Sequence, residues 1–296
     1  MKRREFIKQS AALSSLICLS GIIPAEAAGK EASVVAVSGE SPAEIARRAV
    51  AELGGMGRFV SRGDVVMIKP NIAWNRTPEQ AATTHPEVVR AMVELALGAG
   101  AKKVIVMDNP CHRAADTYER SGIAAAARQA GAEVRFADEN RLVVHDFKGE
   151  YVRNWQVYRD FLEVDKFINV PILKHHGSSE LTIAMKNLFG ILGGNRGKLH
   201  RDMGENIADL ASGFPSHLVV VDAYRILTRN GPVGGRLSDV ALKKTVIASA
   251  NIVEADAVAA EFFGVVPGEV EFLQAAASRK MGEIDSNKIV RKSLTI

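Results

Sequence analysis

The chain has 296 residues, of which 47% are hydrophobic and 24% charged, and its formal net charge is +4. This composition supports a sizeable buried core and excludes a disordered or low-complexity chain. The small charge, and the lack of any basic tract with interleaved aromatic residues, argue against nucleic-acid binding.

The first residues have the pattern of an export signal. Arg3 and Arg4 precede an apolar run over residues 11–23, which ends in an Ala-x-Ala step at 25–27. A basic start, a short apolar run and small residues before a cleavage site are typical of a signal peptide, and paired arginines are typical of the twin-arginine (Tat) route. We therefore expect a signal peptide over residues 1–27, contact with the Tat export machinery, membrane contact only during export, and a periplasmic protein. An uncleaved anchor is the alternative, although the run is shorter than the roughly 20 residues that span a bilayer.

Cysteine is scarce. Cys18 lies in the predicted signal, so Cys111 is the one cysteine of the mature sequence. We expect no internal disulfide and no intrinsic iron–sulfur cluster, because both need more cysteines. The favoured interpretation of Cys111 is a small buried side chain, and a reactive thiol is the alternative.

From residue 33 onward, apolar β-branched runs alternate with alanine-rich helical stretches. Strands are predicted over residues 33–37, 65–68, 104–107, 134–137, 167–173, 218–221 and 245–249. Helices are predicted over residues 42–53, 86–97, 118–130, 254–263 and 269–279, with another beginning near residue 181 and ending near 190. This alternation predicts a single α/β domain over residues 28–296, with a mostly parallel twisted sheet and helices on both faces.

Three stretches interrupt that pattern. Residues 142–147 and 151–158 alternate in polarity and predict an inserted antiparallel β-hairpin. Pro171 within its apolar run indicates an edge position or a bulge. The glycine-rich, basic segment 193–198 is predicted to be a flexible surface loop. A phosphate cradle is only the alternative, because the segment lacks the G-K-[ST] sequence of a P-loop.

Polar side chains follow four of the expected strands, and ligands of open parallel sheets bind beyond the carboxyl ends of the strands. These side chains are Lys69 and Asn71, then Asp108, then Lys174, His175 and His176, and finally Asp222. The sequence therefore predicts a polar ligand site at this edge of the sheet. Structural roles are the alternative to ligand binding. Asn71 or Asp108 would then form a turn, and Lys69 would be solvated.

Two kinds of ligand fit these residue types. A small anionic ligand or cofactor would contact Lys69, Asn71, Thr84, Lys186 and Asn187, of which Thr84 precedes a helix N-terminus. A transition metal would take His175, His176, His200, Asp108 and Asp222, since imidazole and carboxylate are suitable ligands. Catalytic roles are predicted for His175, His176 and Lys174, because histidine titrates near neutral pH.

Several segments in this order resemble the DUF362 family of uncharacterised proteins. They are Val-Met-Ile-Lys-Pro-Asn at 66–71, Thr-His-Pro at 84–86, Pro-Ile-Leu-Lys-His-His at 171–176, Ala-Met-Lys-Asn-Leu-Phe-Gly at 184–190, and His200. The resemblance covers residues from about 64 to 264. Many relatives carry ferredoxin-type cysteine motifs, which this sequence lacks. The order of strands with Lys, His and Asp at their ends is also similar to that of the nickel-pincer lactate racemases, as an analogy of fold.

Together these features predict an exported protein that binds a metal or a small anionic ligand in a strand-end cleft, with the reaction and the oligomeric state left open. A non-catalytic periplasmic ligand-binding protein is one alternative. An electron-transfer accessory protein is another, which the absence of cysteine clusters, a haem-attachment motif and a Rossmann fingerprint disfavours.

Overall fold

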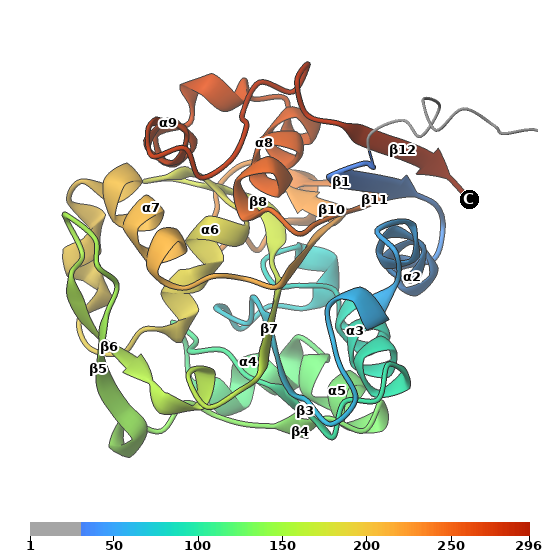
Figure 1. The fold of residues 1–296 in the computed structure, drawn as a ribbon, viewed down its shortest axis with the longest axis horizontal. Helices are drawn as coiled ribbons and strands as arrows, with labels where there is room; N and C mark the ends of the chain where they lie inside the picture. The colour runs from blue at the N-terminus through green and yellow to red at the C-terminus, as the bar shows by residue number, and fades with distance from the viewer. Residues whose placement is uncertain (1–30) are drawn as a thin grey trace, which may run out of the picture. The chain divides into compact units, whose positions relative to one another are not determined.

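Most strands of the central sheet form where the sequence has apolar, β-branched runs (Figure 1). The computed structural model describes residues 31–296. The export signal predicted over residues 1–27 lies outside the described residues. Neighbouring strands follow the order β12 (Arg291–Thr295), β1 (Val34–Ser38), β11 (Val240–Ser249), β10 (Leu218–Leu227), β7 (Lys166–Val170), β2 (Val65–Pro70), β3 (Lys103–Val106) and β4 (Glu133–Val134). Off this path, β8 (Ile172–His176) pairs with β10, and β9 (Glu180–Thr182) pairs with β8.

The sheet is mixed and mostly parallel. Strands β10, β7, β2, β3 and β4 pair in parallel, whereas β11 is antiparallel to both β10 and β1. Strand β12 is parallel to β1 and forms the edge beside it. The predicted α/β class is therefore confirmed. Strand β12 was not predicted, because its sequence, Arg-Lys-Ser-Leu-Thr, has no apolar run.

Helices cover both faces of the sheet, as predicted (Figure 1). One face packs against α2 (Pro42–Glu52), α3 (Pro86–Gly98), α4 (Ala114–Arg120) and α5 (Ile123–Gln129), and the other against α6 (Ala184–Asn187), α7 (Met203–Gly213), α8 (Ile252–Phe263) and α9 (Glu271–Ser278). Successive side chains of a strand enter opposite layers. Thus Met67 packs on the side of α6 to α9, and its neighbours Val66 and Ile68 pack on the other. Within the described residues no helix is both long enough and apolar enough to cross a membrane.

The inserted hairpin is confirmed as a separate two-stranded sheet. Strand β5 (Leu142–Asp146) pairs antiparallel with β6 (Asn154–Tyr158). A hydrogen bond connects the hairpin with a segment outside it, because the indole N–H of Trp155 in β6 donates to the Gly193 carbonyl at 2.9 Å.

Two predicted helices are wrong in extent. The helix expected over residues 118–130 is divided into α4 and α5, because Gly122 between them has a left-handed φ of 72°. The helix expected to begin near residue 181 begins at Ala184, and residues 180–182 form β9 instead. A short 3₁₀ helix, Leu188–Ile191, continues from α6.

The N-terminus of α6 is capped from α8. The carboxylate of Asp256 accepts the N–H groups of Ala184 and Met185 at 2.8 and 2.9 Å. It therefore pairs two of the amides that a helix leaves free at its start.

Pro171 interrupts a strand in the interior of the sheet. The apolar run 167–173 divides at this residue into β7 and β8, and β7 pairs with β10 on one side and with β2 on the other. The predicted edge position is therefore wrong. Because proline has no N–H to donate, it lies between the two strands, and its carbonyl accepts the N–H of Asp222 at 2.8 Å.

Candidate functional site

A cavity of about 360 Å³ lies beyond the ends of β2 and β3, beside β8 and α6. A volume of this order is typical of sites for small molecules, which begin at about 300 Å³. Eight residues of the predicted site line it: Lys69, Asn71, Asp108, Lys174, His176, Lys186, Asn187 and His200. Three do not belong to its lining: Thr84, His175 and Asp222.

Lys69 and Asp108 form a buried ion pair where β2 and β3 end. The Nζ atom lies 2.7 Å from Asp108 Oδ1, and the two side chains are 0% and 3% exposed. Lys69 also donates to the Pro70 carbonyl at 3.0 Å, and Asp108 Oδ2 accepts the N–H of Ile72 at 2.6 Å. Burial lowers the pKa of Lys69, and the Asp108 carboxylate opposes that change. Both groups are thus paired inside the protein.

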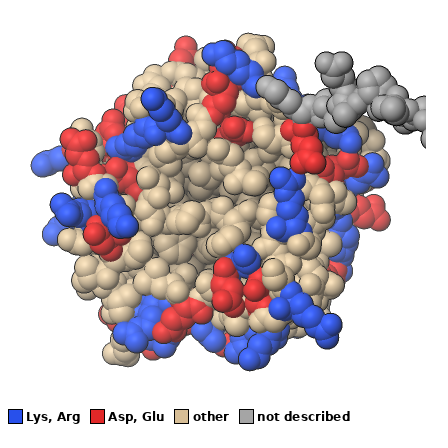
Figure 2. Space-filling view, viewed as in Figure 1, with Lys and Arg blue, Asp and Glu red and all other residues tan. Residues whose placement is uncertain are grey.

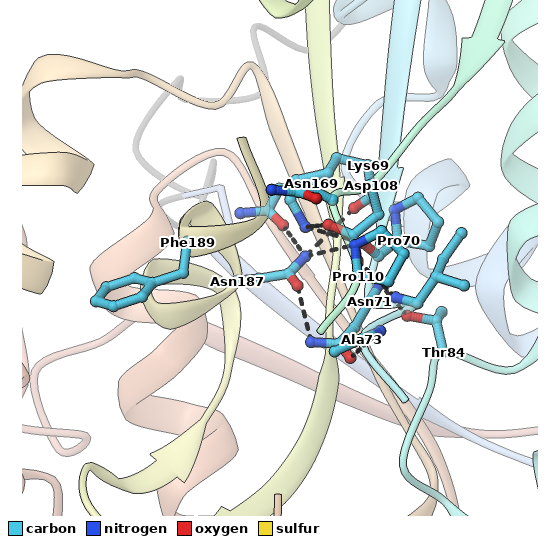
Figure 3. A network of polar contacts seen from close by, with 12 residues as sticks. Lys69, Pro70, Asn71, Ala73, Thr84, Asp108, Pro110, Asn169, Asn187 and Phe189 are labelled. Carbon is cyan, nitrogen blue, oxygen red and sulfur yellow. Dashed lines mark hydrogen bonds and ion pairs between the residues drawn. The ribbon is translucent and has the colours of Figure 1, made fainter. Parts of the chain in front are cut away.

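A chain of amides connects the strands with α6 at the cavity (Figure 3). Asn71 Nδ2 donates to Asn187 Oδ1 at 3.0 Å, and Asn187 Nδ2 donates to Asn169 Oδ1 at 2.8 Å. Asn169 Nδ2 in turn donates to the Ala184 carbonyl at 2.9 Å. The polar atoms of Asn71 and Asn187 are therefore engaged within the protein, where they fix the position of α6 relative to β2 and β7.

Lys174 reaches the cavity from β8 and is 1% exposed. Its Nζ donates to Asn71 Oδ1 at 3.2 Å and to the Ala82 carbonyl. It forms no ion pair with any residue between 31 and 296. Burial lowers the pKa of Lys174 to about 7. Both its ammonium and its amine form are therefore populated near neutral pH.

Lys186 reaches the same cavity from α6 and is 6% exposed. Its Nζ lies 3.2 Å from the centroid of the Phe189 ring, a cation–π arrangement. Within the described part of the chain, this Nζ has neither a hydrogen bond nor an ion pair. Burial lowers the pKa of Lys186 to about 7, and the nearby Arg196 contributes in the same direction.

Arg196 is the residue of the site that sequence interpretation missed. It begins a 3₁₀ helix, Arg196–His200, in the segment expected to be a flexible loop. Its guanidinium donates to the carbonyls of Asn109 at 2.9 Å, Pro110 at 3.1 Å and Phe189 at 3.2 Å. Three carbonyls on two segments thus hold Arg196 in the wall of the cavity.

The loop after β3 supplies the outer wall. Cys111 lies on this loop and is exposed, so the prediction of a buried thiol is wrong. The reason is local, because the Cys111 N–H bonds the Ala73 carbonyl at 2.9 Å and keeps the residue on a surface turn. Beside it Trp74, another lining residue, meets the ring of His112 edge-on at a centroid distance of 5.0 Å.

All three histidines of the predicted site have Nδ1 engaged by a backbone group, so Nε2 is the free nitrogen of each ring. His176 Nδ1 accepts the N–H groups of Ser178 and Ser179 at 3.1 and 3.3 Å, which leaves the proton on Nε2. His175 Nδ1 accepts the N–H of Gly231 at 3.1 Å, on the opposite side of the strand. Burial lowers the pKa of His176 to about 3, with Lys186 and Lys174 adding to the effect, so this ring is neutral at physiological pH.

His200 has the opposite tautomer. Its Nδ1 bonds the Gly197 carbonyl at 3.2 Å and so carries the proton, which leaves the lone pair on Nε2. The ring meets Phe189 edge-on, with the centroids 6.2 Å apart. His200 therefore lines the cavity with Nδ1 engaged and with Nε2 free of a partner among the described residues.

The residues predicted as metal ligands are not gathered in one place. Over residues 31–296 no group of three or more His, Cys, Asp or Glu side chains could hold a metal ion. The lone pairs on Nδ1 of His175 and His176 are occupied by backbone N–H groups.

Asp222 and Thr84 support the start of α3. Asp222 lies inside β10, which continues to Leu227, so the expectation that a strand ends before it is wrong. Its Oδ2 accepts the N–H of His85 at 2.7 Å, and its burial raises its pKa. Thr84 Oγ1 donates to the Val170 carbonyl at 2.7 Å, while His85 provides the helix cap by accepting the Glu87 N–H at 3.2 Å.

The cavity contains an excess of basic groups. Lys69, Lys174, Lys186 and Arg196 line it together with one carboxylate, that of Asp108. On the molecular face in Figure 2, basic and acidic side chains are intermixed around the margin and no large area has one sign. The three lysines of this basic excess are buried, at the ends of the strands.

The fold and the site thus define the class of the molecule, an α/β protein with a basic cavity beyond the ends of its strands. The family model described as "Domain of unknown function (DUF362)" matches residues 66–261, and the chain belongs to this family. This match confirms the resemblance carried by the Lys-Pro-Asn and Met-Lys-Asn-Leu-Phe-Gly segments.

Two known proteins are similar over most of the chain. A thylakoid-associated protein of Synechocystis sp. is 27% identical over 245 residues, which cover 78% of this chain and 72% of that protein. The lactate racemase apoprotein from Thermoanaerobacterium thermosaccharolyticum is similar in structure, with a TM-score of 0.48 and 11% sequence identity. That similarity covers 81% of this chain but only 58% of the racemase chain.

Proposed function

We propose that the cavity binds a small organic anion through its basic side chains. The observation that carries the proposal is that Lys174 and Lys186 are buried in the lining without a carboxylate partner among the described residues. Burying an unpaired ammonium group is costly, and a bound carboxylate or phosphate would offset that cost by pairing with it.

The size and the other walls of the cavity narrow the class of ligand. A volume of about 360 Å³ accommodates a small molecule. Trp74, Phe189 and Val233 add apolar surface to the lining. A compact anion with a small carbon body matches this combination better than inorganic phosphate alone.

Titration calorimetry with a set of small carboxylates and phosphate esters tests the proposal. Replacing one buried cation, in Lys174→Met or Lys186→Met, should weaken binding about 10- to 150-fold, since a charged hydrogen bond contributes about 1.5–3 kcal/mol. The matched control is Lys198→Met, which removes an exposed lysine outside the lining and should bind as the wild type does.

Two outcomes would overturn the proposal. One is that no anion of the set binds. The other is that elemental analysis finds near-stoichiometric transition metal that is lost in His176→Ala and His200→Ala, which would make the cavity a metal site.

We further propose that the protein is exported in its folded form by the twin-arginine route and acts in the periplasm. The support is the sequence order of Arg3, Arg4, the apolar run 11–23 and the Ala-x-Ala step. Cell fractionation of the double variant Arg3→Lys/Arg4→Lys should find the protein retained in the cytoplasm. Unchanged export of this variant would contradict the proposal.

A further inference from the structure

The three buried lysines of the cavity differ in what their amines contact. The Nζ atom of Lys69 is paired with the Asp108 carboxylate at 2.7 Å. Lys174 donates to Asn71 Oδ1 and to the Ala82 carbonyl, which engage two of the three hydrogens of its ammonium form. Lys186 has no such partner within residues 31–296, and its Nζ lies over the face of Phe189 at 3.2 Å. Lys186 is therefore the lysine whose amine is free for a reacting group.

The surroundings of Lys186 favour the neutral, nucleophilic amine. It is 6% exposed and shares the cavity with three other basic side chains. Burial lowers its pKa to about 7, where a substantial fraction of the amine is unprotonated at neutral pH. Desolvation and neighbouring cations are the conditions under which lysine attacks carbonyl compounds.

We propose that Lys186 forms a Schiff base with the carbonyl group of a small 2-oxo acid bound in this cavity. The proposal deepens the function proposed above and rests on it, because the carboxylate of the oxo acid would be held by the cations of the same cavity. Lys174 and Arg196 are the two that remain for this role, since Lys69 already pairs with Asp108.

The bond changes are those of imine formation. The Lys186 nitrogen attacks the carbonyl carbon, so a C–N bond forms while the carbonyl π bond breaks. The oxygen takes one proton from the attacking nitrogen and a second from solvent, and leaves as water. The product is an iminium ion between Lys186 and the former carbonyl carbon, with no change in oxidation state.

His200 lines the same cavity as Lys186, and we assign it the transfer of the first of these protons. Its Nε2 holds a lone pair, because Nδ1 bonds the Gly197 carbonyl. The His200 ring and Lys186 Nζ both contact Phe189. A neutral imidazole can accept the proton from the attacking nitrogen and return it to the leaving oxygen.

Reductive trapping tests the proposal. The full-length protein is incubated with glyoxylate, pyruvate or 2-oxoglutarate, reduced with borohydride and digested, and the modified lysine is identified by mass spectrometry. Binding of pyruvate and of oxamate is measured in parallel by calorimetry. Oxamate has the shape and charge of pyruvate, but its amide carbonyl does not form imines. We expect reduced oxo-acid adducts on Lys186 and unmodified protein after incubation with oxamate.

Matched variants separate charge from nucleophilicity. Lys186→Arg keeps a cation over Phe189, so it should retain oxamate binding and lose the adduct. Lys198→Arg makes the same change at an exposed lysine and should be labelled as the wild type is. His200→Gln should retain oxamate binding while trapping slows by roughly 100-fold, the contribution typical of a proton carrier.

The outcomes distinguish the two proposals. If pyruvate and oxamate bind but no adduct forms, or if the adduct maps to another lysine, the Schiff-base proposal is wrong and the anion proposal stands. If neither ligand binds while another anion of the calorimetry set does, only the Schiff-base proposal is wrong. If no anion of that set binds, both proposals fail. Peptide mapping of the wild-type protein identifies the lysine that carries the adduct, and so tests the Schiff-base proposal even if a variant does not fold.

Discussion

Gly190 and Asp108 are in such close contact that no side chain fits between them. A Cβ atom on Gly190 would lie 1.9 Å from Asp108 Oδ1 and 2.6 Å from Lys69 Nζ. The Gly190 carbonyl also accepts the N–H of Asn109 at 3.0 Å. Glycine at the end of the Met-Lys-Asn-Leu-Phe-Gly segment therefore lets the chain pass directly over the buried ion pair.

Gly190→Ala should therefore destabilise the fold by about 1–3 kcal/mol, the usual result of overpacking, and should weaken anion binding because Lys69 and Asp108 must move. Urea denaturation and calorimetry measure the two effects. The control is Gly57→Ala, since a Cβ at Gly57 would have no neighbour within 4 Å. Equal stability of the two variants would contradict the steric argument.

The Lys69–Asp108 ion pair should show strong coupling in a double-mutant cycle. Lys69→Met leaves the Asp108 carboxylate buried without its partner and should lower the free energy of unfolding by about 3–5 kcal/mol. Adding Asp108→Asn should recover part of that loss, because the remaining amide carries no charge. If the two single effects simply add in the double variant, the residues are not coupled as the 2.7 Å contact requires.

Lys186 should make stability depend on pH in the alkaline range. Its pKa is lowered in the folded state to about 7 from an ordinary value of 10.5, so between these values the unfolded chain binds more protons. Stability should therefore rise with pH over this range, and the destabilising effect of the buried charge is fully present below pH 7. Lys186→Met should be more stable than the wild type at pH 7, with a difference that shrinks toward pH 10.5.

Denaturant titrations across that range check this expectation. Lys198→Met, at an exposed position, should match the wild type at each pH. A Lys186→Met advantage that stays constant up to pH 10.5 would contradict the assigned pKa.

Anion affinity should fall as the pH rises through about 7, where Lys174 and Lys186 lose their protons. An anion pairs with the ammonium form, so binding near neutral pH should draw protons onto these lysines. Calorimetry in buffers of different ionisation enthalpy measures that proton uptake. Binding without proton uptake, and with the same affinity on both sides of pH 7, would show that neither lysine contacts the anion.

The rule that ligands bind beyond the ends of parallel strands accounts for what the sequence could predict. Lys69, Asp108 and Lys174 follow apolar runs that are recognisable without a structure, and parallel pairing brings those ends to one edge. The rule failed for Asp222. There β10 continues for several residues past its apolar half because β11 pairs with it, and nothing in the local sequence marks that partner.

Arg196 shows the other limit of sequence interpretation. Its segment is rich in glycine and asparagine, a composition typical of loops, and its role depends on carbonyls of residues far away in the chain. The Nδ1 atoms of His176 and His200, by contrast, bond backbone groups only two or three residues away, so local turns that residue type does not specify orient these rings. The residue type indicates which chemistry each of these side chains is capable of. The contacts of the folded chain determine which of its atoms are engaged and which are available.

The position of Trp74 gives the protein an intrinsic optical reporter. Of the two tryptophans in the sequence, Trp74 lines the cavity, and Trp155 lies on the hairpin with its indole N–H bonded to Gly193. An occupant of the cavity changes the polarity around the first indole, whereas the second indole adds emission that does not report on the cavity. Emission from a Trp155→Phe protein would therefore follow occupancy of the cavity in real time, without a dye and without knowledge of the ligand.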